Sequence, residues 1–174
     1  MLKTFLFIAA LFLCPLDSQA SGTSMRAMTT DEVIDTDAPP PVPSDWTVVP
    51  SPFADVHSTN GDKPTALRLS RHIAEALPRL AEDLDVAIGN RIHVVVAPTQ
   101  ALFHELQPGS APDWADGTAW PKRGWIFLRA PRLRGQTTET LEMVLEHELV
   151  HVLLGRAFGP RKVPRWLQEG AAQL

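Results

Sequence analysis

Several residue types that would point to a particular class of protein are scarce or missing. The chain of 174 residues holds one cysteine, Cys14, and no tyrosine. A single cysteine excludes an internal disulfide framework and a zinc cluster built from thiolates. Basic residues are not in excess, since 16 Lys and Arg stand against 20 Asp and Glu, and the net charge of −4 argues against electrostatic binding of nucleic acid. What is present, 44% hydrophobic residues, is typical of a globular domain with a buried core.

The first twenty residues have the layout of a secretory signal peptide. Lys3 precedes an apolar run from Phe5 to Leu13, and small residues lead up to Ala20. The run is too short to cross a bilayer core of about 30 Å, so no stable membrane span is expected after cleavage. A lipid-modified cysteine at Cys14 is an alternative, although the residue before such a cysteine is normally small. We therefore expect residues 1–20 to be removed after Ala20 and the protein to be exported, either periplasmic or secreted.

Residues 21–45 are expected to form a disordered or extended linker. They are rich in Ser, Thr, Asp and Pro and include the run Pro39-Pro40-Pro41-Val42-Pro43. Such a segment buries too little apolar surface to offset the entropy lost on ordering. The folded domain is expected to occupy residues 46–174.

Within that domain, strand-like and helix-like patterns alternate. Strands are predicted at 46–49, 91–96 and 124–128, and a short helix at 99–106. Apolar residues at spacings of three and four predict an amphipathic helix after Pro64, which Pro78 should kink or divide; they are Leu69, Ile73, Leu77, Leu80 and Leu84. These patterns predict an α+β fold with a small mixed sheet.

The last third of the chain is predicted to be helical and carries the most informative motif. A helix is expected over 138–154, with Thr137 or Thr138 as its N-cap and Gly155 at its end. Residues 147–151 read HELVH, an HExxH motif. On a helix, His147 and His151 project from one face, so two imidazole nitrogens can bind one Zn²⁺ ion. Glu148 lies beside them, where a carboxylate can take a proton from water that the metal activates.

A catalytic zinc ion normally has a third protein ligand. After His151 the chain contains no Asp, Cys or His, and Glu169 is its one acidic residue. A second helix opened by Pro164 would carry Glu169 and could pack against the first. The alternatives are that the two histidines are half-buried core residues and that Glu169 is an exposed helix carboxylate.

The motif and the segment around Glu169, WLQEGAA, resemble the gluzincin metallopeptidases, and most closely their peptidase MA-like group. The resemblance implies a zincin-like fold with Zn²⁺ bound by His147, His151 and Glu169, and with Glu148 as the general base and acid. It covers residues 141–172 most specifically. More loosely, Gly117, Thr118, Ala119 and the strand Trp125 to Leu128 resemble the active-site edge strand, which in that family binds extended peptide substrates.

The chain departs from the family after the third ligand. The family's fold continues into a second helical subdomain, often with a Tyr or His that stabilises the oxyanion, whereas Leu174 follows Glu169 by five residues. In a zinc peptidase acting on peptides or proteins, an arginine or a backbone group would then stabilise the oxyanion, unless the chain is a fragment whose site is incomplete. The alternative to a peptidase is a non-catalytic zinc-binding envelope domain that acts as an interaction module.

Overall fold

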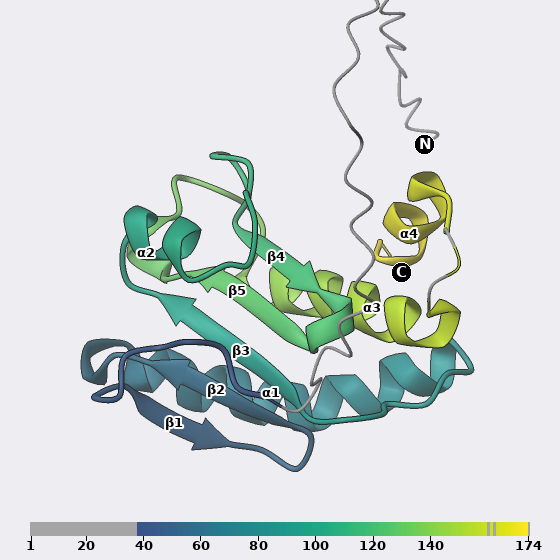
Figure 1. Ribbon diagram of the computed structural model, residues 1–174, viewed down its shortest axis with the longest axis horizontal. Coiled ribbons are helices and arrows are strands. Elements are labelled where there is room, and N and C mark those ends of the chain that lie inside the picture. Colours follow the sequence, from purple (N-terminus) through teal and green to yellow (C-terminus); the bar gives the residue numbers. More distant parts are fainter. Residues whose placement is uncertain (1–37, 160, 162, 174) are drawn as a thin grey trace, which may run out of the picture. The chain divides into compact units, whose positions relative to one another are not determined.

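A computed structural model describes residues 38–159, 161 and 163–173 (Figure 1). The expected signal peptide at 1–20 and residues 21–37 of the expected linker lie outside this range. Within it, the fold is α+β: a five-stranded mixed sheet with helices on both faces.

The strands lie in the order β1-β2-β3-β5-β4. Their bounds are β1 Thr47–Pro50, β2 Ala54–Ser58, β3 Ile92–Ala97, β4 Gly117–Trp120 and β5 Trp125–Arg129. The central pairs β2–β3 and β3–β5 are parallel, whereas β1 and β4 join antiparallel at the two edges. The strands predicted at 91–96 and 124–128 are confirmed to within one residue as β3 and β5.

Two long helices cover one face of the sheet, and a short helix covers the other (Figure 1). Helices α1 Lys63–Asp83 and α3 Leu141–Phe158 bury their apolar faces in the main core, against Val56, Val94 and Ile126. Helix α2 Gln100–Glu105 lies on the opposite face, where Phe103 packs with Phe127. Helix α4 Arg165–Ala171 follows α3. Three single turns of 3-10 helix complete the elements: η1 Asn60–Asp62, η2 Pro121–Arg123 and η3 Pro131–Leu133.

Helix α1 is not divided at Pro78, contrary to one of the outcomes expected from the sequence. It runs without interruption from Lys63 to Asp83. The apolar residues that precede the proline are fully buried, namely Leu69, Ile73 and Leu77. Leu80, which follows it, is 7% exposed. Packing of this continuous apolar face offsets the hydrogen bond that Pro78 cannot donate.

The domain's packing starts upstream of the boundary expected at Trp46. The indole Nε1 of Trp125 donates a hydrogen bond of 2.9 Å to the carbonyl oxygen of Ala38. Val42 and Trp46 pack against the cluster formed by Phe103 and Phe127. Ala38 and Val42, assigned to the linker by composition, thus contact residues on the α2 face of the sheet.

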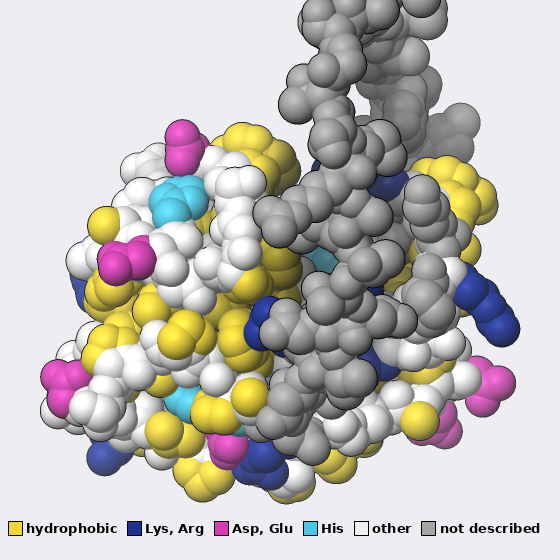
Figure 2. Space-filling view, viewed as in Figure 1, with side chains coloured by type: hydrophobic (Ala, Val, Ile, Leu, Met, Phe, Trp, Pro, Cys, Tyr) yellow, Lys and Arg dark blue, Asp and Glu magenta, His cyan; other side chains and the backbone are white. Residues whose placement is uncertain are grey.

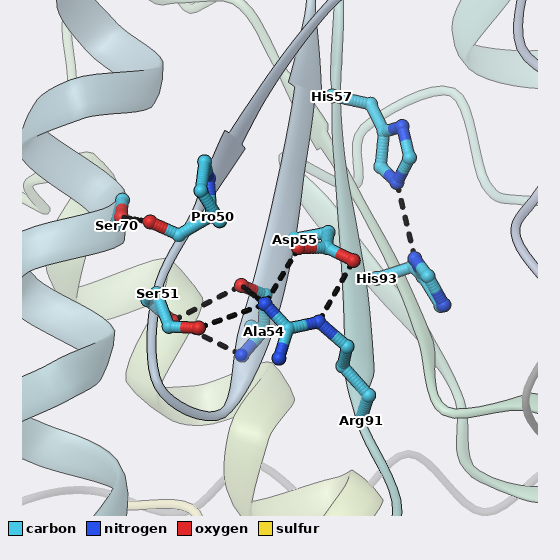
Figure 3. A network of polar contacts seen from close by, with 8 residues as sticks. All are labelled: Pro50, Ser51, Ala54, Asp55, His57, Ser70, Arg91 and His93. Atoms are coloured by element: carbon cyan, nitrogen blue, oxygen red, sulfur yellow. Dashed lines mark hydrogen bonds and ion pairs between the residues drawn. The ribbon is translucent and has the colours of Figure 1, made fainter.

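A polar network ties β2 to β3 where these two parallel strands begin (Figure 3). The Arg91 guanidinium donates from Nε to Oδ2 of Asp55 at 2.8 Å and from Nη2 to Oδ1 at 2.7 Å. Its Nη2 also bonds the carbonyl oxygens of Ser51 and Ala54. Beside this ion pair, His57 Nε2 and His93 Nδ1 lie 3.1 Å apart, and both side chains are buried.

Acidic, basic and hydrophobic side chains are interspersed over the part of the surface that is visible and coloured in Figure 2. Among the described helices, none combines the length and the apolar character needed to cross a membrane.

Candidate metal centre

The HExxH helix is longer than the sequence pattern indicated. Thr140 is its N-cap: its hydroxyl accepts a hydrogen bond of 3.2 Å from the amide of Met143, so the predicted caps Thr137 and Thr138 are wrong. The helix continues past Gly155 to Phe158, and Gly159, with φ of 58°, ends it. Gly155 is needed for a different reason, because a Cβ there would collide with the side chain of Pro121 in η2.

The helix brings the two motif histidines together on one side. Their rings are edge to face with centroids 4.7 Å apart, and their Nε2 atoms are 3.1 Å apart. Glu169 reaches them from α4: its Oε2 lies 3.6 Å from Nε2 of His147 and 4.0 Å from Nε2 of His151. In the described part of the chain, these three residues are the group of His, Cys, Asp and Glu whose ligand atoms converge closely enough to hold a metal ion.

The geometry of this triangle fits a tetrahedral zinc ion. Zinc bonds to His nitrogen and carboxylate oxygen are about 2.0–2.2 Å, which separates neighbouring tetrahedral ligands by about 3.3–3.6 Å. The three measured separations of 3.1, 3.6 and 4.0 Å bracket this value. Two nitrogens and one carboxylate oxygen are also the donor set of a catalytic zinc site with one open position.

Helix α4 has the start that the sequence predicted. The carbonyl oxygen of Pro164 accepts hydrogen bonds from the amides of Leu167 and Gln168, at 3.0 and 3.3 Å. The Gln168 side chain bonds back to the carbonyl oxygen of Val163 at 3.0 Å. The other oxygen of Glu169, Oε1, lies 3.6 Å from Nε of Arg165, one turn earlier. These contacts leave Oε2 of Glu169 directed at the histidines.

Glu148 lies on the buried side of the histidine pair. The residue is 7% exposed, and burial together with the nearby negative charge of Glu169 raises the pKa of its carboxyl to about 8. A divalent cation at the histidines would oppose both effects. The pKa of His151 is lowered by burial and by the proximity of His147, which favours the neutral imidazole that a metal ligand requires.

Gly117 in β4 lies close to this carboxylate. A Cβ at Gly117 would lie 3.0 Å from both Cγ and Oε1 of Glu148 and 2.7 Å from Cγ1 of Val144. The backbone of β4 therefore passes against α3 at the level of the candidate base. This close approach is possible because residue 117 has no side chain.

Residues 117–119 do begin the edge strand β4, but they do not share one role. Gly117 lines a cleft of about 530 Å³ together with His147 and Glu148. The Thr118 hydroxyl instead donates a 2.7 Å hydrogen bond to Gln107, and Ala119 packs against the main core. Strand β5, which the resemblance also linked to the edge, is an interior strand between β3 and β4.

The cleft has further walls that the motif did not reveal. Met143 and Val144 line it from one helical turn before His147, and Trp114, which is 78% exposed, lines it from the loop before β4. The helical spacing of Met143 and Val144 from His147 could have indicated their position. No sequence pattern indicates Trp114, because its loop is placed by tertiary contacts.

The upstream histidines lie elsewhere. His57 and His93 form the buried pair between β2 and β3, and His72 Nε2 lies 2.7 Å from Glu146 Oε1. His104, from the second His-Glu pair in the sequence, contacts Gln100 on α2.

Comparison with family models, curated proteins and solved structures finds no match for this chain. The interpretation of the site therefore depends on its residues and their geometry.

Proposed function

We propose that this protein is an exported zinc-dependent peptidase of the gluzincin, peptidase MA-like type, with a zincin-like arrangement of sheet and HExxH helix. The observation that carries the proposal is the convergence of His147, His151 and Glu169 beside the buried carboxyl of Glu148. Residues from two helices, α3 and α4, which are separated in the chain by residues 159–164, supply the ligand set.

Zinc, when bound, would supply a Lewis acid that lowers the pKa of coordinated water toward about 7 and polarises the scissile carbonyl. The residues of the chain divide the remaining work. His147, His151 and Glu169 hold the ion. Glu148 accepts the proton of the attacking water and returns it to the leaving amine. The environment that raises its pKa is suited to a group that must hold a proton during the reaction.

The edge strand offers a means of binding peptide. β4 is the last strand of the sheet, hydrogen-bonded to β5 along one side. An extended peptide can add to the other side through main-chain hydrogen bonds. Because Gly117 lies against Glu148, a peptide paired with β4 would run past the candidate base and the ligands.

The experiment is metal analysis of the purified protein together with peptide cleavage by wild type and Glu148→Gln. We expect one equivalent of zinc in both proteins and a loss of cleavage of about 10²–10⁴-fold in the variant. Glu105→Gln is the matched control. Glu105 belongs to the second His-Glu pair of the sequence, His104-Glu105, but it is exposed on α2. A wild-type protein without zinc would contradict the proposal.

A non-catalytic zinc-binding domain is the second candidate, and one observation favours it. The described residues that line the cleft include no arginine, lysine or tyrosine that could stabilise the oxyanion. This candidate predicts bound zinc, no cleavage across a broad peptide library, and no measurable effect of Glu148→Gln on binding of a partner.

A further inference from the structure

A second hollow lies at the opposite end of β4 from Gly117. It has a volume of about 500 Å³. Trp120, Pro121 and Phe158 give it apolar walls, and three basic residues, Lys122, Arg123 and Arg161, line it as well. We call it the basic pocket.

No carboxylate in the described part of the chain compensates the charge of the basic pocket. Its lining contains no Asp or Glu, and among the described residues none of its three cations has a carboxylate partner. Arg123 instead lies over the ring of Trp125 at 4.9 Å. By contrast, three other arginines of the domain, Arg91, Arg132 and Arg134, each bind an aspartate.

The basic pocket is held in a fixed position relative to the candidate metal centre. Strand β4 and helix α3 run side by side in the same direction: Gly117 lies against Val144 and Glu148, and Pro121 lies against Gly155. The Trp120 indole, which forms one wall, donates a hydrogen bond of 3.1 Å to Gln107. Gln168, the residue before Glu169, forms another part of the lining. The ligands therefore lie between the cleft at Gly117 and the basic pocket at Trp120.

We propose that the basic pocket binds an acidic side chain of the substrate, on the N-terminal side of the bond that is cleaved. This proposal rests on the proposed peptidase function. Uncompensated cations beside an apolar wall are complementary to a carboxylate on a partly apolar stem, such as Glu. The cleft at the other end of β4 has no lysine or arginine in its described lining and offers no such site.

The direction of the peptide follows from strand pairing. β4 runs from Gly117 to Trp120, so a chain that pairs antiparallel with it, the slightly more stable arrangement, has its N-terminal part at Trp120. The N-terminal part of a bound substrate does not include its C-terminal carboxylate. The negative charge that the basic pocket binds must therefore come from a side chain. Gly155 lies one helical turn, about 6 Å, beyond His151. An extended peptide covers this distance in about two residues.

The test uses three peptides that differ only at the second residue before the cleaved bond, which is Glu, Gln or Lys. For wild type we expect kcat/KM for the Glu peptide to exceed that for the Gln peptide by about tenfold, mainly through KM, and the Lys peptide to be worst. The Lys122→Gln, Arg123→Gln double variant, which keeps one of the three cations, should lose most of the preference for the Glu peptide over the Gln peptide. Arg71→Gln is the matched control, since Arg71 is an exposed cation of α1 that bonds the Leu67 carbonyl and lines neither hollow.

Equal kcat/KM for the Glu and Gln peptides in wild type, or a preference that persists undiminished in the double variant, would overturn the proposal. Calorimetric binding of the same peptides to Glu148→Gln separates the pocket from the chemistry. Tighter binding of the Glu peptide, mostly lost in the double variant, would support the pocket even if wild type cleaves none of the peptides. Cleavage without such a preference would support the peptidase function and contradict the pocket.

Discussion

The Cβ that Gly117 does not have would lie 3.0 Å from Oε1 of Glu148. A strand at the edge of the sheet and the helix that carries the HExxH motif are thus in contact at the candidate base. No other glycine of the described chain has a candidate catalytic carboxylate as its crowded neighbour.

Gly117→Ala is therefore expected to impair catalysis while leaving zinc in place. The added methyl group must displace Glu148 or Val144, and such overpacking costs about 1–3 kcal/mol. A carboxylate moved from its position should lower kcat by at least about tenfold. Steady-state kinetics with metal analysis checks this, and Gly135→Ala is the control because a Cβ there meets nothing within 4 Å. A variant as active as wild type would show that the contact does not position Glu148.

Glu169→Ala should weaken zinc binding rather than impair chemistry alone. It removes one of three converging ligands, so we expect the Kd for zinc to rise by more than about 100-fold. The rise in Tm on adding zinc, which depends on the ratio of zinc concentration to Kd, should disappear as well. Glu75→Ala, an exposed carboxylate on α1, is the matched control. Unchanged zinc affinity in the Glu169 variant would exclude it as a ligand.

Arg91→Lys is expected to lower the free energy of unfolding by about 1–3 kcal/mol. The guanidinium binds both oxygens of Asp55 and two backbone carbonyls at once, and it holds the pKa of Asp55 below its usual value. A lysine cannot reproduce this planar arrangement. In contrast, Arg68→Lys changes a single exposed contact with Glu142 and should cost less than about 0.5 kcal/mol. Urea denaturation of both variants measures the difference.

The pair His57–His93 predicts sensitivity to acid. Burial, and then the neighbouring His93, lowers the pKa of His57 from 6.5 to about 4. The unfolded chain takes up this proton first, so the stability that depends on neutral His57 is complete above about pH 6.5 and is lost as the pH falls toward 4. The contribution amounts to about 3 kcal/mol over this window.

His57→Asn should flatten the dependence of unfolding free energy on pH between 6.5 and 4, because asparagine keeps a hydrogen-bonding group and does not titrate. Equal slopes for the wild type and the His57 variant would contradict the assignment.

The sequence predicted the elements whose signal is local. The spacing of Leu69, Ile73 and Leu77 predicted α1, and the β-branched run at 92–96 predicted β3. Strand β2 was missed because it reads ADVHS, with Asp55 and His57 on one face. These polar residues are tolerated in a buried strand because Arg91, directly before β3, and His93, in β3, bind them.

The convergence of the three candidate ligands was predictable where chemistry limits the choice. Helical spacing places His147 and His151 on one face, and Glu169 is the one acidic residue after them. Gly155 was assigned as a helix end, whereas it allows η2 to pack closely against α3. The position of η2, and with it the basic pocket, depends on contacts between segments distant in the sequence, which no local pattern contains.

Helix α4 has seven residues, and none of them is buried. A helix of this length is marginal on its own in water. If Glu169 binds the metal, then docking of α4 and metal affinity are thermodynamically linked, and each stabilises the other by the same free energy. Chelation would therefore do more than remove a cofactor: it would release the C-terminal segment from the domain, and faster amide exchange confined to residues 163–173 would report it.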